Sequence, residues 1–206
     1  MKIACYAAGS VGTNNYVISD DNGITAIIDC DGSPAPLYQY VEQNHLKVTH
    51  ILLTHGHIDH MGACESLRTE LGVKVYALTE EEDLLLDAKQ NLSVYIARKV
   101  VTFAPDEFVH DGQELELAGV KLEVFHTPGH TPGGCSYYVA DAGCVFSGDT
   151  LFAESVGRSD FPGGSTSALV RAVKEKLFLL PDDTLVCPGH GEETTIGHEK
   201  KYNSFV

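Results

Sequence analysis

Three histidines and one aspartate lie within six positions, in the segment Thr-His-Gly-His-Ile-Asp-His that ends at residue 60. Imidazole nitrogens and carboxylate oxygens are common ligands of divalent metal ions. His55 and His57 are one residue apart, so in an extended segment their side chains point the same way. Asp59 and His60 follow at the expected start of a helix. The segment predicts two adjacent pairs of metal ligands, although an isolated His-x-His pair also occurs by chance.

Three further metal-capable residues follow other apolar runs along the chain. His130 follows the segment Phe-His-Thr-Pro-Gly, Asp149 follows Val-Phe-Ser-Gly, and His190 follows Leu-Val-Cys-Pro-Gly. Each of these residues alone would be read as an ordinary turn residue. Together with the first segment they place five histidines and two aspartates at four expected strand ends, which is where a scaffold carries its functional side chains.

These seven side chains are enough for two metal ions. A catalytic zinc ion typically takes three protein ligands and keeps one position for water, and two ions about 3.5–4 Å apart can share a hydroxide. The expected ligands are His55, His57 and His130 for one ion, Asp59, His60 and His190 for the other, and Asp149 as a bridge between them. Nitrogen and carboxylate ligands suit Zn, and they also suit Fe or Mn.

Strands and helices recur in both halves of the chain, and four of the expected strands end in polar loops that carry His55, His130, Asp149 and His190. A helix from Asp59 is expected to end at Gly72, Thr79 and Ser165 are expected helix caps, and residues 197–203 are expected to form a terminal turn. The expected strands are 14–19, 24–30, 48–55, 73–77, 120–130, 134–140, 143–149 and 183–190, and the expected helices are 34–45, 59–72, 79–89 and 165–180. This order indicates one α/β domain with two sheets inside and helices outside.

The composition limits the classes of partner. The chain has 206 residues, 43% of them hydrophobic, and a formal net charge of −15. This charge argues against nucleic acid, which needs Lys and Arg to contact phosphates. No apolar run is long enough for a membrane span, and the N-terminus lacks the apolar core of a signal peptide, so we expect a cytoplasmic protein. The six cysteines lack paired Cys-x-x-Cys spacing and are expected to be small buried side chains.

The motifs His-x-His-x-Asp-His, Thr-Pro-Gly-His, Gly-Asp-Thr-Leu-Phe and Pro-Gly-His-Gly occur in this order along the chain. Together they resemble the metallo-β-lactamase-fold superfamily, and within it the small glyoxalase II-type, hydroxyacylglutathione hydrolase-like enzymes. The resemblance implies a four-layer αββα sandwich spanning residues 1–206 as a single domain, with the ligand assignment above at one edge of the two sheets. The C-terminal helical domain with which full-length glyoxalase II enzymes bind glutathione is expected to be absent.

The resemblance implies a dinuclear metal-dependent hydrolase. A metal-bound hydroxide would attack the carbonyl of a small-molecule thioester of the hydroxyacylglutathione type, or of a related ester, and the metals would stabilise the oxyanion. Asp59 would hold a ligand position and orient the hydroxide, which makes it the expected catalytic residue. Arg158 is expected either to bind a substrate carboxylate or to form a structural salt bridge.

Two alternatives remain open at the level of the sequence. The segment Gly-Arg-Ser-Asp-Phe at residues 157–161 also resembles a motif of persulfide dioxygenases, which use a single iron in the same fold. Asp160 would repel an anionic substrate, so glutathione specificity does not follow from Arg158. The other alternative is a non-catalytic metal-binding protein that interacts with other proteins. A β-lactam hydrolase is disfavoured, because the common zinc enzymes of that class have a Cys near the position of Asp149.

Overall fold

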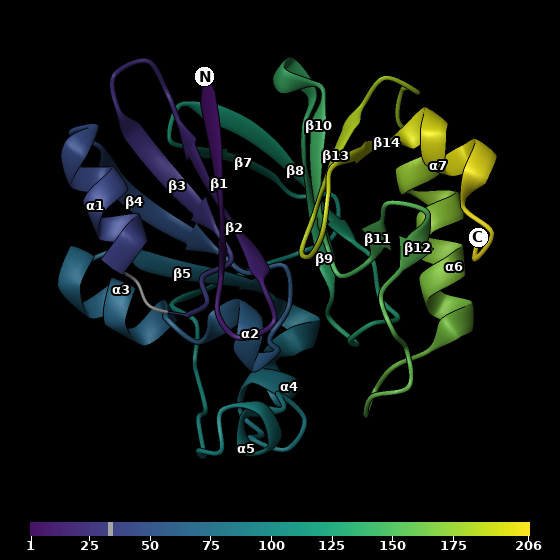
Figure 1. The fold of residues 1–206 in the computed structure, drawn as a ribbon, viewed down its shortest axis with the longest axis horizontal. Helices are drawn as coiled ribbons and strands as arrows, with labels where there is room; N and C mark the ends of the chain where they lie inside the picture. The colour runs from purple at the N-terminus through teal and green to yellow at the C-terminus, as the bar shows by residue number, and fades with distance from the viewer. Residues whose placement is uncertain (33–34) are drawn as a thin grey trace.

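Two six-stranded β-sheets stack face to face in the computed structural model, which describes residues 1–32 and 35–206. The first sheet has the strand order β1-β2-β3-β4-β5-β6 and the second has the order β14-β13-β10-β9-β8-β7 (Figure 1). The strands of the first sheet are β1 (Lys2–Ala8), β2 (Thr13–Ser19), β3 (Ile24–Ile28), β4 (Lys47–Leu52), β5 (Lys74–Leu78) and β6 (Glu107–Val109). Those of the second are β7 (Glu114–Leu117), β8 (Val120–His126), β9 (Cys135–Val139), β10 (Cys144–Gly148), β13 (Leu185–Pro188) and β14 (Thr194–Thr195).

Helices cover the outer faces of both sheets (Figure 1). On the first sheet lie α1 (Ala35–Gln43) and α3 (Cys64–Leu71), and on the second lie α6 (Thr166–Glu175) and α7 (Ile196–Tyr202). Short elements gather at one end of the molecule: α2 (Ile58–Met61), the 3-10 helix η1 (Thr79–Glu81), α4 (Glu82–Leu85) and α5 (Ser93–Ile96). The remaining elements are the hairpin β11 (Leu151–Phe152) and β12 (Ser155–Val156) and the 3-10 helices η2 (Ala140–Ala142) and η3 (Leu177–Leu179). The expected αββα sandwich is confirmed.

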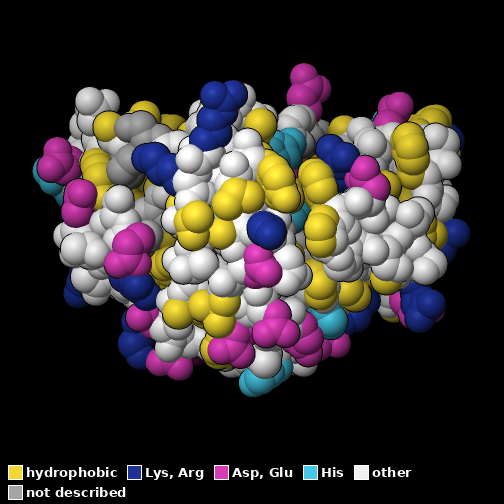
Figure 2. Space-filling model, turned by 90° about the horizontal axis from the view of Figure 1, so that it is seen from below, with side chains coloured by type: hydrophobic (Ala, Val, Ile, Leu, Met, Phe, Trp, Pro, Cys, Tyr) yellow, Lys and Arg dark blue, Asp and Glu magenta, His cyan; other side chains and the backbone are white. Residues whose placement is uncertain are grey.

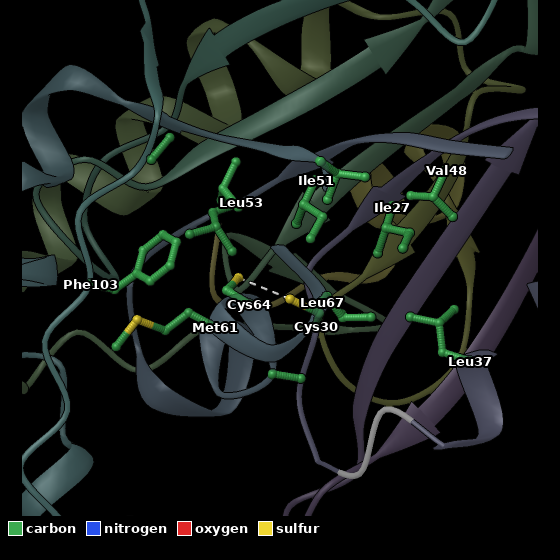
Figure 3. Close-up of a cluster of buried hydrophobic side chains, with 14 of the residues drawn as sticks. Ile27, Cys30, Leu37, Val48, Ile51, Leu53, Met61, Cys64, Leu67 and Phe103 are labelled. Carbon is green, nitrogen blue, oxygen red and sulfur yellow. Dashed lines mark hydrogen bonds between the residues drawn. The ribbon is translucent and has the colours of Figure 1, made fainter. Parts of the chain in front are cut away.

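The core follows from the alternation of side chains along each strand. In β2, Tyr16 and Ile18 pack between the two sheets, whereas Val17 between them packs toward the helices of the first sheet. The helix-side cluster also contains the buried pair Cys30 and Cys64, whose sulfur atoms lie 2.9 Å apart (Figure 3). Five of the six cysteines are buried and all six are free, as expected for small apolar side chains.

The strand directions explain why one edge of the sandwich collects polar side chains. β3, β4 and β5 run parallel to one another in the first sheet, and β10 and β13 run parallel in the second. The carboxyl ends of parallel strands meet at one edge of a sheet, where loops are free to carry polar groups. An isolated bridge between Thr13 and His190 joins the two sheets near this edge.

Several local expectations need correction. The helix expected from Asp59 to Gly72 is interrupted after Met61, because Cys30 N–H bonds to His60 O at 2.8 Å and Ala63 N–H bonds to Cys30 O at 3.0 Å. These backbone groups therefore pair with another segment instead of continuing a helix. Gly72 does end α3, in the left-handed conformation.

Of the expected helix caps and chain ends, some are confirmed and others are wrong. Thr79 does not cap a helix, since its hydroxyl donates to Val109 O at 3.2 Å. Ser165 is the N-cap of α6, and its hydroxyl accepts from Ala168 N–H. The expected terminal turn is the helix α7. The first expected helix, 34–45, corresponds to α1, which ends at Gln43. Its expected start, Pro34, lies outside the described residues. Within the described residues, no helix combines the length and apolar character needed to span a bilayer.

Candidate metal centre

The structure brings all seven expected ligands together at the edge where the strands end. Overlapping groups of three ligand atoms lie within 4.8 Å of one another. The groups are His55, His57 and His130; His55, His60 and Asp149; and Asp59, His60 and His190. We call the first the three-histidine group and the last the mixed group. Side chains from four separate chain segments therefore form one continuous cluster, as the sequence predicts.

The three-histidine group is buried. His55 and His57 are each 2% exposed and His130 is 5% exposed. His57 Nδ1 lies 2.9 Å from His130 Nε2. The Nε2 atoms of His55 and His57 are both inaccessible and have no hydrogen-bond partner. A buried polar atom without a partner is costly in a native protein unless an ion or water satisfies it.

The mixed group lies beside it and is more accessible. His190 Nε2 lies 3.4 Å from Asp59 Oδ2 and 3.3 Å from His60 Nε2. The side chain of His190 is 24% exposed and that of Asp59 is 13% exposed, whereas His60 is fully buried. The exposed members give this group direct access to solvent and to a ligand.

Asp149 lies between the two groups. Its carboxylate oxygens are 3.4 Å from His60 Nε2, 3.5 Å from His130 Nε2 and 3.6 Å from His190 Nε2. One side chain thus approaches both groups at similar distances. This is the position expected for a carboxylate that bridges two ions.

Asp29 was missed by the sequence reasoning. It follows β3, and its Oδ2 accepts hydrogen bonds from His60 Nδ1 at 2.8 Å and from the hydroxyl of Thr54 at 2.7 Å. A carboxylate on the outer nitrogen of an imidazole fixes the ring so that its other nitrogen faces the metal. Asp29 ends an apolar strand just as the ligands do, and this was the signal available in the segment Ile-Ile-Asp-Cys.

Arg158 contributes to the centre through its backbone. Its carbonyl oxygen accepts a hydrogen bond from His130 Nδ1 at 2.6 Å, which leaves Nε2 of that ring facing the cluster. Its guanidinium binds Asp160 through two hydrogen bonds of 2.7 Å and lies 4.0 Å from the centre of the Phe161 ring. The structural salt bridge considered for Arg158 is therefore formed.

The pKa values of the buried imidazoles shift in opposite directions. Burial lowers the pKa of His55 well below its ordinary value, and burial together with the neighbouring His130 lowers the pKa of His57 to about 3. Both rings are therefore neutral, which is the form that binds a metal. Burial disfavours a charge on His60, but the carboxylates of Asp149 and Asp29 outweigh it and raise the pKa of His60.

The carboxylates of the cluster stay ionised. Burial raises the pKa of Asp149, but the charge of His60 and its hydrogen bond outweigh burial and lower it. For Asp59, the hydrogen bond from His190 and the charge of His60 likewise outweigh burial, so its pKa is lowered.

A divalent ion fits this cluster. The imidazoles of His55 and His57 are neutral and enclosed, with His55 Nε2 unpartnered and His57 Nδ1 directed at His130 Nε2. The adjacent carboxylates supply negative charge. Imidazole and carboxylate donors without thiolate suit Zn, Fe or Mn. The cluster has the donor set of a binuclear metal site, and the donors alone leave the identity of the metal open.

A cleft of about 480 Å³ opens beside the cluster. Its lining includes five members of the cluster, Arg158 and several apolar side chains. The apolar side chains are Val11, Leu92, Ile96, Phe152 and Phe161.

Figure 2 views the end of the molecule at which α4 and α5 lie: hydrophobic side chains are spread over the middle of this face, and acidic side chains gather along its lower edge.

Known proteins resemble the chain over its whole length. A probable metallo-hydrolase of Bacillus subtilis, YqgX, is 39% identical and covers 100% of this chain and 98% of its own length. The hydroxyacylglutathione hydrolase GloC of Haemophilus influenzae is 37% identical, with the same shares covered.

Solved structures superpose closely. The crystal structure of the BLEG-1 B3 metallo-beta-lactamase has a TM-score of 0.94 at 36% identity, covering 99% of each chain. TTHA1623 in a di-iron-bound form has a TM-score of 0.88 at 34% identity, covering 98% of this chain and 100% of its own. ETHE1 from Myxococcus xanthus has a TM-score of 0.80 at 30% identity, covering 99% and 84%. The family model for the metallo-beta-lactamase superfamily matches residues 8–190, and the chain therefore belongs to this superfamily, as its motifs predicted.

Proposed function

We propose that this protein is a dinuclear metal-dependent hydrolase that acts on small-molecule thioesters of the hydroxyacylglutathione type or on related esters. The observation that carries the proposal is the convergence of the three-histidine group, with its buried and unpartnered His55 Nε2, and the mixed group around Asp149 beside an open cleft. The full-length similarity to a hydroxyacylglutathione hydrolase supports the thioester class.

Two bound divalent ions would lower the pKa of a coordinated water toward neutrality and polarise a substrate carbonyl. The protein's own contribution is orientation. The carbonyl of Arg158 fixes the ring of His130, and Asp29 fixes the ring of His60, so both Nε2 atoms face the cluster. Asp59 lines the cleft as an ionised carboxylate, placed to hold and orient the attacking water.

The cleft also limits the substrate. Its wall is apolar apart from the cluster and Arg158, so it suits an acyl group or thiol with a substantial apolar part. The guanidinium of Arg158 is already held by Asp160. Recognition of a substrate carboxylate by Arg158 therefore requires this exposed ion pair to open. We propose a thioester substrate without a strict requirement for glutathione.

A second candidate is a persulfide dioxygenase-like enzyme with a single iron. It is favoured by the segment at residues 157–161, which resembles a motif of persulfide dioxygenases, and is compatible with the similarity to ETHE1 from Myxococcus xanthus. A third candidate, of another class, is a metal-binding protein without catalytic activity. The complete set of seven candidate ligands and the accessible cleft favour the hydrolase.

The deciding experiment measures the metal content of the protein as isolated, together with its activity. We expect close to two ions per chain and hydrolysis of S-lactoylglutathione or another member of a panel of thioesters and esters. Hydrolysis of a β-lactam alone would overturn the proposed substrate class. One tightly bound iron with oxygen uptake on a persulfide would overturn the hydrolase in favour of the dioxygenase. Two bound ions without turnover of any panel member would favour the non-catalytic protein.

A matched pair of histidine variants ties the activity to the cluster. His57→Ala should lose metal and activity together, because it removes one ligand of the three-histidine group. His110→Ala changes an exposed histidine outside the cluster and should keep both. A fully active His57→Ala enzyme would exclude the proposed metal centre.

A further inference from the structure

Glu81 is a completely buried carboxylate that is not one of the expected ligands. It ends η1, directly after β5, and its exposure is 0%. Its two neighbours in sequence, Glu80 and Glu82, are exposed. Acidic side chains are almost never fully buried unless a specific partner holds them. A place at the start of the expected helix 79–89 does not explain why Glu81 is buried while its two neighbours are exposed.

Its two oxygens bind two different loops of the metal centre. Oε1 accepts a hydrogen bond from the backbone N–H of Gly56 at 2.8 Å, and Oε2 accepts one from the backbone N–H of Gly133 at 2.7 Å. Gly56 lies between His55 and His57, and Gly133 lies three residues after His130. One carboxylate thus joins the two segments that carry the three-histidine group.

Both loops are pressed against the segment that carries Glu81. A Cβ atom on Gly133 would lie 2.2 Å from the backbone nitrogen of Glu81, and a Cβ atom on Gly56 would lie 2.8 Å from Leu85 Cδ2. Only glycine fits at these two approaches. Burial raises the pKa of Glu81 to about 7, while the two backbone N–H groups act in the opposite direction. The carboxylate of Glu81 is therefore closely packed between the two loops, and the backbone N–H groups of Gly56 and Gly133 both depend on it as their acceptor.

We propose that Glu81 is a positioning residue that fixes the spacing between the His55–His57 loop and the His130 loop, and so sets the metal affinity of the three-histidine group. It touches no ligand atom and acts through the backbone of the two loops. The mixed group contacts a different buried carboxylate, Asp29. The inference rests on the proposed metal centre but not on the substrate, so absence of thioester hydrolysis would leave it intact.

Glu81→Gln tests the proposal with minimal change of shape. The amide keeps one acceptor oxygen but presents an NH₂ group to one of the two backbone N–H donors, which leaves that donor unpaired. The variant is made in two single-site backgrounds. His190→Ala leaves the three-histidine group intact, and His57→Ala leaves the mixed group intact. The affinity for Zn²⁺ is measured by competition with a chromophoric chelator, and Glu80→Gln is the matched control.

We expect Glu81→Gln to weaken Zn²⁺ binding about 10–100-fold in the His190→Ala background, the usual cost of losing an outer support of a metal site. In the His57→Ala background its effect should stay below about threefold, and Glu80→Gln should have no effect in either. An equal loss in both backgrounds would show a merely structural role, and no loss in either would also overturn the proposal. If circular dichroism shows that Glu81→Gln is unfolded, Glu81→Asp, which keeps the charge but shortens the side chain by one methylene, must show the same asymmetry.

Discussion

The three-histidine group and the mixed group differ in how they are held. The three-histidine group is enclosed, two of its nitrogens lack any partner, and its loops are joined by a buried carboxylate. Two members of each group line the cleft, but Asp59 and His190 of the mixed group are more exposed than the histidines of the first group and contact each other at 3.4 Å. The first group is therefore the more enclosed and the more tightly held by its loops, whereas the second is the more accessible to solvent. The two groups have similar donor atoms, so they differ mainly in burial and in the buried carboxylate that supports each.

Asp149→Asn should have the largest effect, because it removes the only carboxylate that approaches both groups among the described residues. We expect loss of at least one ion per chain and a fall of kcat/KM by about 10²-fold or more. Metal analysis and steady-state kinetics on a responsive thioester measure this. A variant that keeps two ions and full activity would show that the two groups act without a bridge.

The free energy of unfolding should depend on pH through Glu81, which supports the three-histidine group. Its pKa in the folded protein is about 7, above the ordinary 4.5. The folded state therefore binds the proton of Glu81 more tightly than the unfolded state does. The stability that this proton contributes is fully present below pH 4.5 and is lost as pH rises through 7. At about 1.4 kcal/mol for each pH unit between the two pKa values, the loss is about 3 kcal/mol.

Urea unfolding of the metal-free protein between pH 4.5 and pH 8 measures this loss. The difference in unfolding free energy between the wild type and Glu81→Gln should fall by that amount as pH rises, since all other titrating groups are shared. A difference that is constant with pH would mean that Glu81 is ionised throughout this range, and would weaken its assignment to an enclosed site.

Asp29→Asn should separate the two groups from the other side. The amide keeps the shape of Asp29 but holds the ring of His60 less firmly, so Zn²⁺ affinity of the mixed group should fall about 10–100-fold. The three-histidine group, measured in the His190→Ala background, should weaken less, because Asp29 reaches His55 only indirectly, through the hydroxyl of Thr54. Asp21→Asn, at an exposed carboxylate, is the control. Equal weakening of both groups would remove the contrast between them.

Asp160→Asn should have the smallest effect and concerns the cleft rim. It releases the guanidinium of Arg158, which is then free to meet a substrate carboxylate. Because the ion pair is exposed, its opening is cheap, and we expect KM for an anionic thioester to fall only about threefold. KM for a neutral ester is the internal control. A rise in KM for the anionic substrate would show that Asp160 itself supports binding.

Much of the centre could be predicted because its ligands carry local signals. His55, His57, Asp59 and His60 are adjacent in the sequence, and the other ligands each follow an apolar strand and a glycine turn. Asp29 has a similar position but is a single acid after a strand, which is too common to indicate a role. Glu81 was read as part of a helix start, and only the approach of Gly56 and Gly133 shows what it binds.

The sequence by itself determined the chemical inventory and the class of fold: residue types, their order along the chain, and strand and helix periodicity are local properties. Tertiary structure decided which atoms meet. It placed the carboxylate of Asp29 on the imidazole of His60, the carbonyl of Arg158 on the imidazole of His130, and the carboxylate of Glu81 on two loops. Contacts between segments separated by dozens of residues depend on how the two sheets pack and on where each strand ends, and no local pattern encodes those distances.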